Sequence, residues 1–509
     1  MAFTFQVNTD KFIHDEKLLA KAESYRPVIH HATIKPVRLL DAEREISRLG
    51  EYCLKRDDRI VLDFGRHIVG KFSVDIAKVG SPQDAPLFMR IKFAEMPAEL
   101  QAESSDYEGW LSRSWIQEEF IHLDELPVRL ELPRRYSFRY VEIKIIDTSP
   151  KWQAVFTNPE AVSESSANYT KLHKPVIHDE VLSRIYDAGV TTLAECMQDV
   201  FEDGPKRDRR LWLGDLRLQA LANYVAFDNT DLVKRCLYLF AGMTTEEGKI
   251  SANVFTRPEN IPDDTFLYEY SLFFISTLYD LNKAHPDAEL VRELYPTCRR
   301  QMDLTLKMID AEGRLITDEN YPVFVDWSND FAKDTAGQAE TIYVLRQFIA
   351  LAEIAGEKDI DNYRSVLGRM EKYSREKLYN ASRKLFVAGE GEYNIASQVW
   401  MVLAHVMSDD ENREILRTMI RELFPVRGIA TPYMYHCIVE ALFEGGLKDE
   451  AVKLMKDYWG KMLELGADTF WEAFDPDKPE YSPYGSPIVN SYCHAWSCTP
   501  VYLISKYLL

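Results

Sequence analysis

Residues 203–215 read Asp-Gly-Pro-Lys-Arg-Asp-Arg-Arg-Leu-Trp-Leu-Gly-Asp, so three carboxylates, four cations and a tryptophan surround a Gly-Pro pair that interrupts any helix. Carboxylates accept hydrogen bonds from hydroxyl groups, guanidinium groups donate them in a rigid fork, and an indole covers the apolar face of a ring. The stretch therefore predicts a site for an uncharged, polyhydroxylated ligand. A solvated loop held by salt bridges is the alternative that charge alone leaves open.

Three later stretches set an aromatic side chain beside a carboxylate or a histidine, at residues 324–330, 466–474 and 491–497. Sugars need this pairing, because their C–H faces stack on indoles while their hydroxyls bond to acids and amides. Tryptophan is also a common core residue, so each stretch alone has a structural explanation. The four stretches together favour a carbohydrate site.

Hydrolysis of a glycosidic bond usually needs two carboxyl groups, one protonated to donate to the leaving oxygen and one ionised to attack or to activate water. The acids of the first stretch and Glu472 are the candidates. The sequence has no Gly-rich phosphate loop, HExxH helix or Gly-x-Ser-x-Gly turn in a suitable context. We therefore expect acid–base chemistry without a cofactor or a metal ion.

The first of two expected domains is an antiparallel β-sandwich over residues 1–165, because apolar residues alternate there at strand spacing. The runs are residues 60–64, 72–76, 87–93, 128–132 and 138–145. Residues 95–125 have the pattern of a long loop, with a mere surface excursion as the alternative. Residues 150–178 suit a linker or a domain seam.

From Asp179 onward apolar positions recur every three or four residues, which predicts about twelve helices. Beyond 181–193 and 216–225, they are expected near 231–242, 264–283, 288–310, 336–355, 359–379, 395–407, 411–423, 433–445, 448–464 and 489–508. Paired helices form a solenoid or a closed barrel, and the lack of a fixed repeat favours the barrel. We expect an (α/α)6 barrel over residues 166–509, with its site where loops converge at one end.

The formal charge of −20 would repel nucleic acid and anionic membranes over most of the surface. The N-terminus lacks the pattern of a signal peptide and no stretch reaches the ~18 apolar residues of a membrane span, so we expect a cytosolic protein. Seven scattered cysteines without a CxxC pair indicate reduced, mostly buried thiols rather than disulfides or a zinc site.

The first stretch resembles the signature Asp-x-Pro-x-Arg-Glu-Arg-x-Gly-Trp-x-Gly-Asp of glycoside hydrolase family 78, the inverting α-L-rhamnosidases. The matching residues are Asp203, Arg207, Trp212, Gly214 and Asp215. Residues 467–472 are similar to the family's Ala-Thr-Thr-x-Trp-Glu, and 491–497 to its Ser-x-x-His-x-Trp-Ser. Residues 63–70 and 138–142 are similar to the β-sandwich that precedes the barrel. The resemblance implies a minimal two-domain form of the six-hairpin glycosidase type.

Carried over position by position, the resemblance implies that Glu472 is the general base and Asp208 the general acid, where the family has glutamate. The sugar would be bound by Asp203, Arg207, Trp212, Asp215, Trp327 and His494. Three of these also have structural explanations, namely an Asx turn, a helix cap and a core histidine. Asp208 retracts its carboxyl by ~1.5 Å relative to glutamate, so either its backbone lies closer to the scissile bond or activity is weak.

Three arginines flank Asp208 and would lower its pKa if all of them faced it. A general acid must stay protonated near its working pH. We therefore expect Arg207 to pair with Asp203 or with the sugar, and Arg209 and Arg210 to point elsewhere.

The resemblance implies an inverting exo-glycosidase that releases terminal α-L-rhamnose from small glycosides or oligosaccharides, with its two carboxyls ~6.5–9.5 Å apart. The alternatives are another (α/α)6 hydrolase or lyase acting on a different sugar, and a catalytically silent rhamnose-binding protein. The expected partner is a rhamnosylated small molecule, without nucleic acid or membrane. A homodimer is expected because closed two-fold assemblies are the commonest oligomers.

Overall fold

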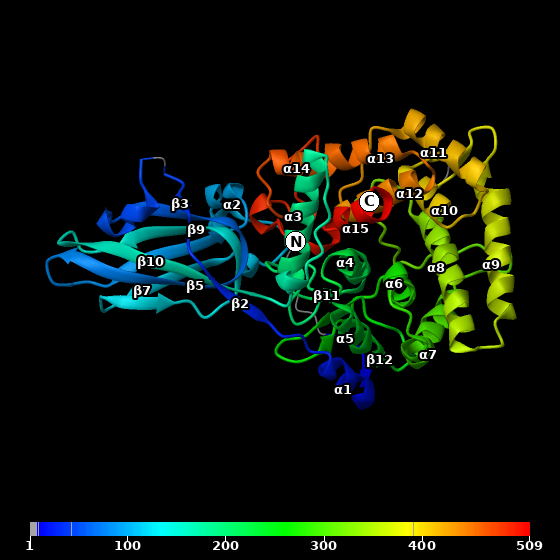
Figure 1. Ribbon diagram of the computed structural model, residues 1–509, viewed down its shortest axis with the longest axis horizontal. Helices are drawn as coiled ribbons and strands as arrows, with labels where there is room; N and C mark the ends of the chain where they lie inside the picture. Colours follow the sequence, from blue (N-terminus) through cyan, green and yellow to red (C-terminus); the bar gives the residue numbers. More distant parts are fainter. Residues whose placement is uncertain (1–7, 9, 42, 390) are drawn as a thin grey trace.

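The computed structural model describes residues 8, 10–41, 43–389 and 391–509, with a strand-rich domain at one end and a helical domain at the other (Figure 1). The strands of the first domain are β2 (His30–Ile34), β3 (Arg38–Leu39), β4 (Cys53–Leu54), β5 (Arg59–Gly80), β6 (Leu87–Ala94), β7 (Glu118–Leu123), β8 (Val128–Glu131), β9 (Tyr136–Asp147) and β10 (Trp152–Ser165). The sheet order is β2-β10-β5-β9-β6-β7, while β3 and β8 pair with β5 and β4 pairs with β10.

The long strand β5 joins two layers of this antiparallel sheet. Its first half pairs with β9, and its second half pairs with β8 and β10. Apolar side chains at alternate positions fill the space between, and the rings of Phe64 and Phe138 lie 5.4 Å apart there. The predicted antiparallel β-sandwich is confirmed.

Two predictions for this part of the chain are wrong in part, although residues 166–178 do join the two domains without an α-helix or a strand, as expected for a linker or seam. Residues 152–165 form the long strand β10 rather than a linker, because the polar residues there alternate with buried ones and a bulge at 157–160 breaks the pattern. The expected loop at 95–125 contains the helix α2 (Pro97–Gln101) and the strand β7. Its remaining part, residues 102–117, extends toward the helical domain, as its contacts below show.

Residues 12–24 lie on the helical domain. Strand β1 (Phe12–His14) pairs with β12 (Met243–Thr245), and helix α1 (Glu16–Ser24) packs on α5 (Figure 1).

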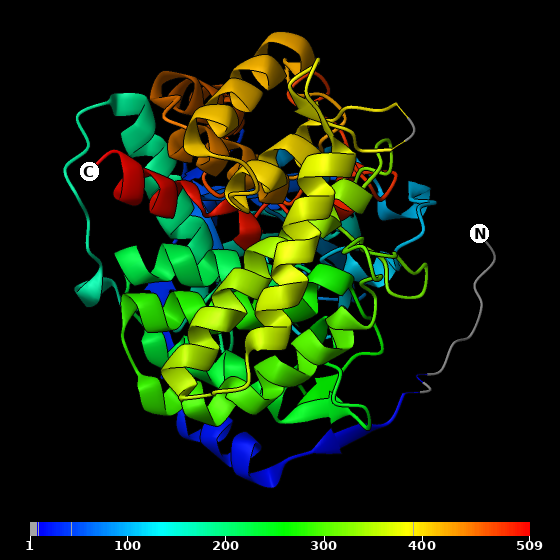
Figure 2. The same ribbon diagram turned by 90° about the vertical axis from the view of Figure 1, so that its right-hand side faces the viewer.

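The helices of the second domain are α3 (Glu180–Cys196), α4 (Leu213–Ala226), α5 (Thr230–Ala241), α6 (Tyr268–Ala284), α7 (Ala288–Leu306), α8 (Asp334–Ala355), α9 (Asp361–Tyr373), α10 (Ile395–Leu403), α11 (Asp409–Leu423), α12 (Pro432–Glu444), α13 (Lys448–Met455), α14 (Lys461–Glu464) and α15 (Pro500–Tyr507). Within the described residues, α4, α6, α8, α10, α12 and α15 form a closed inner ring, since each packs on the next and α15 packs on α4. The remaining helices pack outside it, so the predicted (α/α)6 barrel is confirmed. Figure 2 views this domain from the side away from the sheet.

The last predicted helix is shorter than expected. Only Pro500–Tyr507 is α-helical, whereas residues 487–497 form two short 3-10 turns within a loop. The reason is that backbone N–H groups here bond to distant loops: His494 N donates to Phe470 O at 2.8 Å and Ala495 N donates to Asp203 O at 2.6 Å. Short strands of two or three residues between the helices were also not predicted.

All seven cysteines are free, and six of them are buried, as predicted. Among the described residues no helix combines the length and apolar character needed to cross a bilayer.

Candidate active site

The four predicted stretches meet at the end of the barrel where the inner helices begin. Each inner helix follows an outer one, so the N-terminal ends of the inner helices lie together and the loops before them converge. Backbone hydrogen bonds join 203 to 495 and 470 to 494. The carboxylate of Asp326 accepts hydrogen bonds from the N–H groups of Ala430 and Thr431, which ties the 324–330 stretch to the loop before α12.

Asp203 holds the turn that carries Asp208. Its Oδ2 accepts the N–H of Asp208 at 3.0 Å and its Oδ1 accepts the N–H of Arg210 at 3.1 Å. The side chain is buried, and burial together with the charge of Asp208 raises the pKa of Asp203 to about 7. Asp203 therefore positions the loop by accepting two of its backbone N–H groups.

Gly204 is required by the same turn. A Cβ added there would lie 2.2 Å from Arg207 O and 2.7 Å from Ser491 Oγ, so any side chain would separate the first stretch from the 491–497 stretch. This close approach places His494 beside the first stretch.

Arg207 pairs with Glu472, and the expectation that it would pair with Asp203 is wrong. Its Nη2 donates to Glu472 Oε2 in a very short contact, and its Nη1 lies 3.4 Å from Glu472 Oε1. Its Nε donates to Val489 O at 2.6 Å, and its guanidinium lies 4.0 Å from the centre of the Tyr484 ring. The oxygens of Asp203 instead accept the backbone N–H groups of Asp208 and Arg210.

Glu472 is buried with an exposed fraction of 4%. Burial by itself would raise its pKa, but the charges of Arg207 and His494 and the hydrogen bond from the Tyr484 hydroxyl outweigh burial, so the pKa of Glu472 lies below its ordinary value. A buried carboxylate held ionised in this way can act as a base toward a bound water.

His494 and Asp215 form a second buried pair. The His494 Nε2 atom lies 3.2 Å from Asp215 Oδ1, and neither residue is more than 3% exposed. Burial opposes the charged form of His494, but the carboxylates of Glu472 and Asp215 prevail and raise its pKa. The Nδ1 atom of His494 has no hydrogen-bond partner among the described residues and lies buried against Gly204.

Among the described residues, Arg207 is the one cation within 4.0 Å of the Asp208 carboxyl. The Oδ1 atom of Asp208 lies 4.0 Å from Arg207 Nη1, and the Asp208 side chain is 23% exposed. Arg209 instead donates to the carbonyl oxygens of Lys206 and Arg135, while Arg210 stacks over Phe255 at 3.9 Å and approaches Asp263. Arg209 and Arg210 therefore point elsewhere, as predicted.

Arg207 also limits the separation of the two candidate carboxyls, because its Nη1 contacts both of them. The distance between Asp208 Oδ1 and Glu472 Oε1 can therefore be no greater than the sum of these two N–O distances. That upper limit is compatible with the ~6.5–9.5 Å separation of inverting glycosidases and equally with the ~5–5.5 Å separation of retaining ones.

Aromatic rings line the site between the first stretch and the 324–330 stretch. The rings of Trp212 and Tyr270 lie 6.2 Å apart, those of Tyr270 and Phe324 5.9 Å, and those of Phe324 and Trp327 5.5 Å. Trp496 stacks on Phe324 at 6.2 Å. Trp212 and Trp327 thus belong to one apolar wall, which the sequence motifs predicted only in part.

Several residues that touch the predicted ones were missed. Tyr484 donates to Glu472 and lies over Arg207. Lys206 pairs with the buried Glu99 of α2, and Glu95 Oε2 accepts the N–H of Tyr492 at 2.7 Å. Glu95 and Glu99 belong to the first domain. The sequence signal for a contact with them was the cation Lys206 inside the charged stretch, which needs a carboxylate partner if it is buried.

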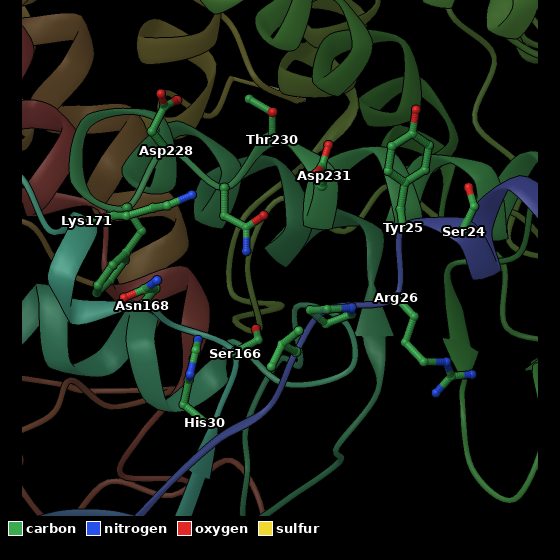
Figure 3. Close-up of a pocket in the computed structure, with 14 residues that line it drawn as sticks. Ser24, Tyr25, Arg26, His30, Ser166, Asn168, Lys171, Asp228, Thr230 and Asp231 are labelled. Carbon is green, nitrogen blue, oxygen red and sulfur yellow. The ribbon is translucent and has the colours of Figure 1, made fainter.

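A separate pocket of about 420 Å³ lies where the segment after α1, the residues after β10 and the α4–α5 turn meet (Figure 3). Its charged lining residues are Arg26, Lys171, Asp228 and Asp231, and His30 lies beside them. It borders the C-terminal end of α4, whereas Asp215 lies in the first turn, roughly 16 Å away at 1.5 Å per residue. None of its lining residues belongs to the predicted site.

Among the described residues, no three His, Cys, Asp or Glu side chains lie close enough together to hold a metal ion. The site combines two carboxyl groups, the buried and ionised Glu472 and the partly exposed Asp208, with a wall of aromatic rings. A β-sandwich followed by a closed helical barrel with this pair defines a six-hairpin glycoside hydrolase.

Comparison with known families agrees with this class. Residues 28–163 match the glycosyl hydrolase family 78 alpha-rhamnosidase N-terminal domain, and residues 177–508 match the bacterial alpha-L-rhamnosidase six-hairpin glycosidase domain. These matches cover most of the chain. The protein belongs to glycoside hydrolase family 78, the α-L-rhamnosidases.

Solved structures are similar over both domains. A rhamnosidase from Klebsiella oxytoca with rhamnose bound is 42% identical, with a TM-score of 0.94 over 98% of this chain and 100% of that chain. The family 78 rhamnosidase of Bacillus sp. GL1 is 19% identical, with a TM-score of 0.73 over 88% of this chain and 46% of its own. The α-L-rhamnosidase of Streptomyces avermitilis complexed with L-rhamnose is 16% identical, with a TM-score of 0.69 over 94% of this chain and 44% of its own. The last two share the fold. No curated protein matches the chain.

Proposed function

We propose that the protein removes terminal α-L-rhamnose from small glycosides or oligosaccharides with inversion, Asp208 donating a proton to the leaving oxygen and Glu472 activating the attacking water. The observation that carries the proposal is the contrast between the two carboxyls. Glu472 is buried and its pKa is lowered, whereas Asp208 is partly exposed and lies 4.0 Å from Arg207.

The sugar-binding groups would be Asp215, His494 and the aromatic wall of Trp212 and Trp327. Asp203 would mainly hold the backbone of the loop that carries Asp208, and Arg207 would mainly bind Glu472. The buried pair of His494 and Asp215, close to Glu472, supports contact of this pair with sugar hydroxyls. The buried position of Glu472 and His494 supports a single terminal sugar rather than a chain that passes through the site. The rhamnose bound in the 42% identical Klebsiella oxytoca structure supports rhamnose as that sugar.

The test is a panel of 4-nitrophenyl glycosides with proton NMR of the released sugar. We expect hydrolysis of the α-L-rhamnoside alone and β-L-rhamnose as the first product, because inversion reverses the anomeric configuration. Release of α-L-rhamnose first would contradict inversion, and cleavage of another glycoside instead would indicate a different sugar. Rhamnose binding without hydrolysis would indicate a silent sugar-binding protein.

We also propose a cytoplasmic homodimer. The seven free cysteines support a reducing compartment. Exposed apolar side chains such as Val28 at 73% and Val176 at 77% support a further interface. Multi-angle light scattering and cell fractionation test the two parts separately, and a monomer at micromolar concentration would contradict the dimer.

A further inference from the structure

A loop of the first domain, residues 102–117, contacts the loop that holds Glu472. The Tyr107 hydroxyl donates to Tyr484 O at 3.2 Å, and the Trp110 indole Nε1 donates to Pro483 O at 3.3 Å. A Cβ added at Gly109 would lie 2.2 Å from Tyr484 O, so the two backbones are in close contact here. The first domain therefore forms part of the rim of the site.

Trp110 is exposed yet held in place. Its side chain is 57% exposed, although its indole N–H is bonded and its ring lies 5.3 Å from the ring of Tyr484. Tyr484 in turn lies 5.9 Å from Trp327. Three rings therefore run from the solvent into the site, and the outermost one presents an uncovered apolar face.

The middle ring of this row touches the reaction centre. The Tyr484 hydroxyl donates to Glu472, and its ring lies 4.0 Å from the guanidinium of Arg207, which also contacts Asp208. In an exo-glycosidase the terminal sugar occupies the buried end of the site. The leaving group extends from there toward solvent, and Trp110 is the outermost, exposed ring of the row that leads from the reaction centre to solvent.

We propose that Trp110 binds the leaving group of the substrate by stacking on a flat apolar face, either an aromatic ring or the C–H face of a second sugar. The first domain thereby sets part of the specificity of the site in the second. This inference rests on the proposed function, because it needs a glycoside whose bond is broken between Asp208 and Glu472.

The test compares three α-L-rhamnosides in the full-length protein: methyl, 4-nitrophenyl and a rhamnosyl-glucose disaccharide. In Trp110→Ala we expect kcat/KM for the ring-bearing leaving groups to fall about three- to tenfold relative to the methyl glycoside, the range of one aromatic stacking contact. Trp110→Phe keeps a ring and should restore most of the loss. Phe120→Ala is the matched control, because Phe120 is also 57% exposed but lies on β7 within the sheet.

Loss with only the nitrophenyl or only the disaccharide substrate would support the inference and identify the preferred leaving group. An unchanged ratio for both, in a Trp110→Ala protein with wild-type circular dichroism, would overturn it, as would a changed oligomeric mass with an unchanged ratio. If Trp110→Ala fails to fold, Trp110→Leu and Trp110→Phe are compared instead. A lower ratio of kcat/KM for the ring-bearing substrates to kcat/KM for the methyl glycoside in Trp110→Leu than in Trp110→Phe supports the inference, and equal ratios overturn it. A wild-type protein inactive on all three substrates would overturn the proposed function and this inference together, whereas activity with an unchanged ratio overturns the inference alone.

Discussion

At the scale of single residues, the shorter acid at position 208 is the main departure from the family signature. Asp203 accepts the N–H groups of both Asp208 and Arg210, so the backbone on either side of the acid is fixed to a buried group. A short side chain on a firmly held backbone can be positioned as well as a longer one on a looser loop. The reach of Asp208 therefore depends on Asp203.

Asp208→Asn should lower kcat/KM for the rhamnosyl-glucose disaccharide by about 10²–10⁴-fold, the usual contribution of a general acid. The loss with 4-nitrophenyl α-L-rhamnoside should be much smaller, because nitrophenolate leaves without protonation. Steady-state kinetics on the two substrates measure the difference. Equal losses on both would argue that Asp208 binds substrate rather than donating a proton.

Glu472→Gln should abolish turnover while rhamnose binding stays within a few-fold of wild type, because the amide keeps the shape of the side chain but cannot take a proton from water. Calorimetric titration with rhamnose checks binding, and the nitrophenyl assay checks turnover. Near-normal turnover would refute the assignment of the base.

Arg207→Met should change the pH dependence of the reaction. The pKa of Glu472 is lowered largely by the charge of Arg207, and the base must be ionised, so wild-type activity persists until pH falls below the ordinary range of a glutamate. Without the guanidinium, burial dominates and the pKa rises. The acid limb of kcat/KM against pH should move upward, and an unmoved limb would show that Arg207 does not control Glu472.

At the scale of elements, helix α2 of the first domain contacts the loops of the candidate site through a buried ion pair. Glu99 pairs with Lys206, whose ammonium also donates to Ile488 O at 3.0 Å and Asn490 O at 2.8 Å. Arg207 donates to the carbonyl between them, that of Val489. The buried Lys206 therefore connects three parts of the molecule: helix α2 of the first domain, the charged stretch 203–215, and residues 488–490, which also bind Arg207, the partner of Glu472.

Lys206→Met should lower the free energy of unfolding by about 3–5 kcal/mol, because it leaves the buried Glu99 without its cation. The kcat should fall as well, since residues 488–490 lose two hydrogen bonds. Adding Glu99→Gln should recover part of the stability, and urea unfolding of the two single variants and the double variant measures the coupling. Strict additivity would mean that the pair contributes nothing as a pair.

At the scale of the whole molecule, the two domains share one site and one seam. Polar contacts cross between them at Glu95, Glu99 and Tyr107, and helix α1, which precedes the first domain in the chain, packs on α5 of the second. The isolated barrel would expose the buried Lys206 and lose the partner of Tyr492 N. We therefore regard the protein as one folding unit despite its two cores.

Scanning calorimetry should accordingly show a single transition for the full chain, with loss of activity at the same temperature. Lys206→Met should shift that transition without splitting it. Two separate transitions would show that the domains unfold independently and that the contacts between them add little to the stability of either domain.

The sequence by itself determined the local features of this protein. Periods of two and of three to four predicted the β-sandwich and nearly all of the helices, because which face of a strand or helix is buried depends on residues a few positions apart. The four polar–aromatic stretches contained Asp208, Glu472 and the binding candidates. The strand β10 was missed because a bulge and exposed polar residues hid its alternation.

Only the tertiary structure decided the partners. Arg207 meets Glu472 across 265 positions, Lys206 meets Glu99 across 107, and Tyr107 meets Tyr484 across 377. No local pattern specifies such pairs, since any buried cation satisfies any nearby carboxylate. The closed ring of inner helices brings the loops together, and burial then selects which charge neutralises which. As a result Arg207, expected to pair with Asp203 or with the sugar, pairs with Glu472. The same packing brought Trp110 of the first domain to the rim of the site.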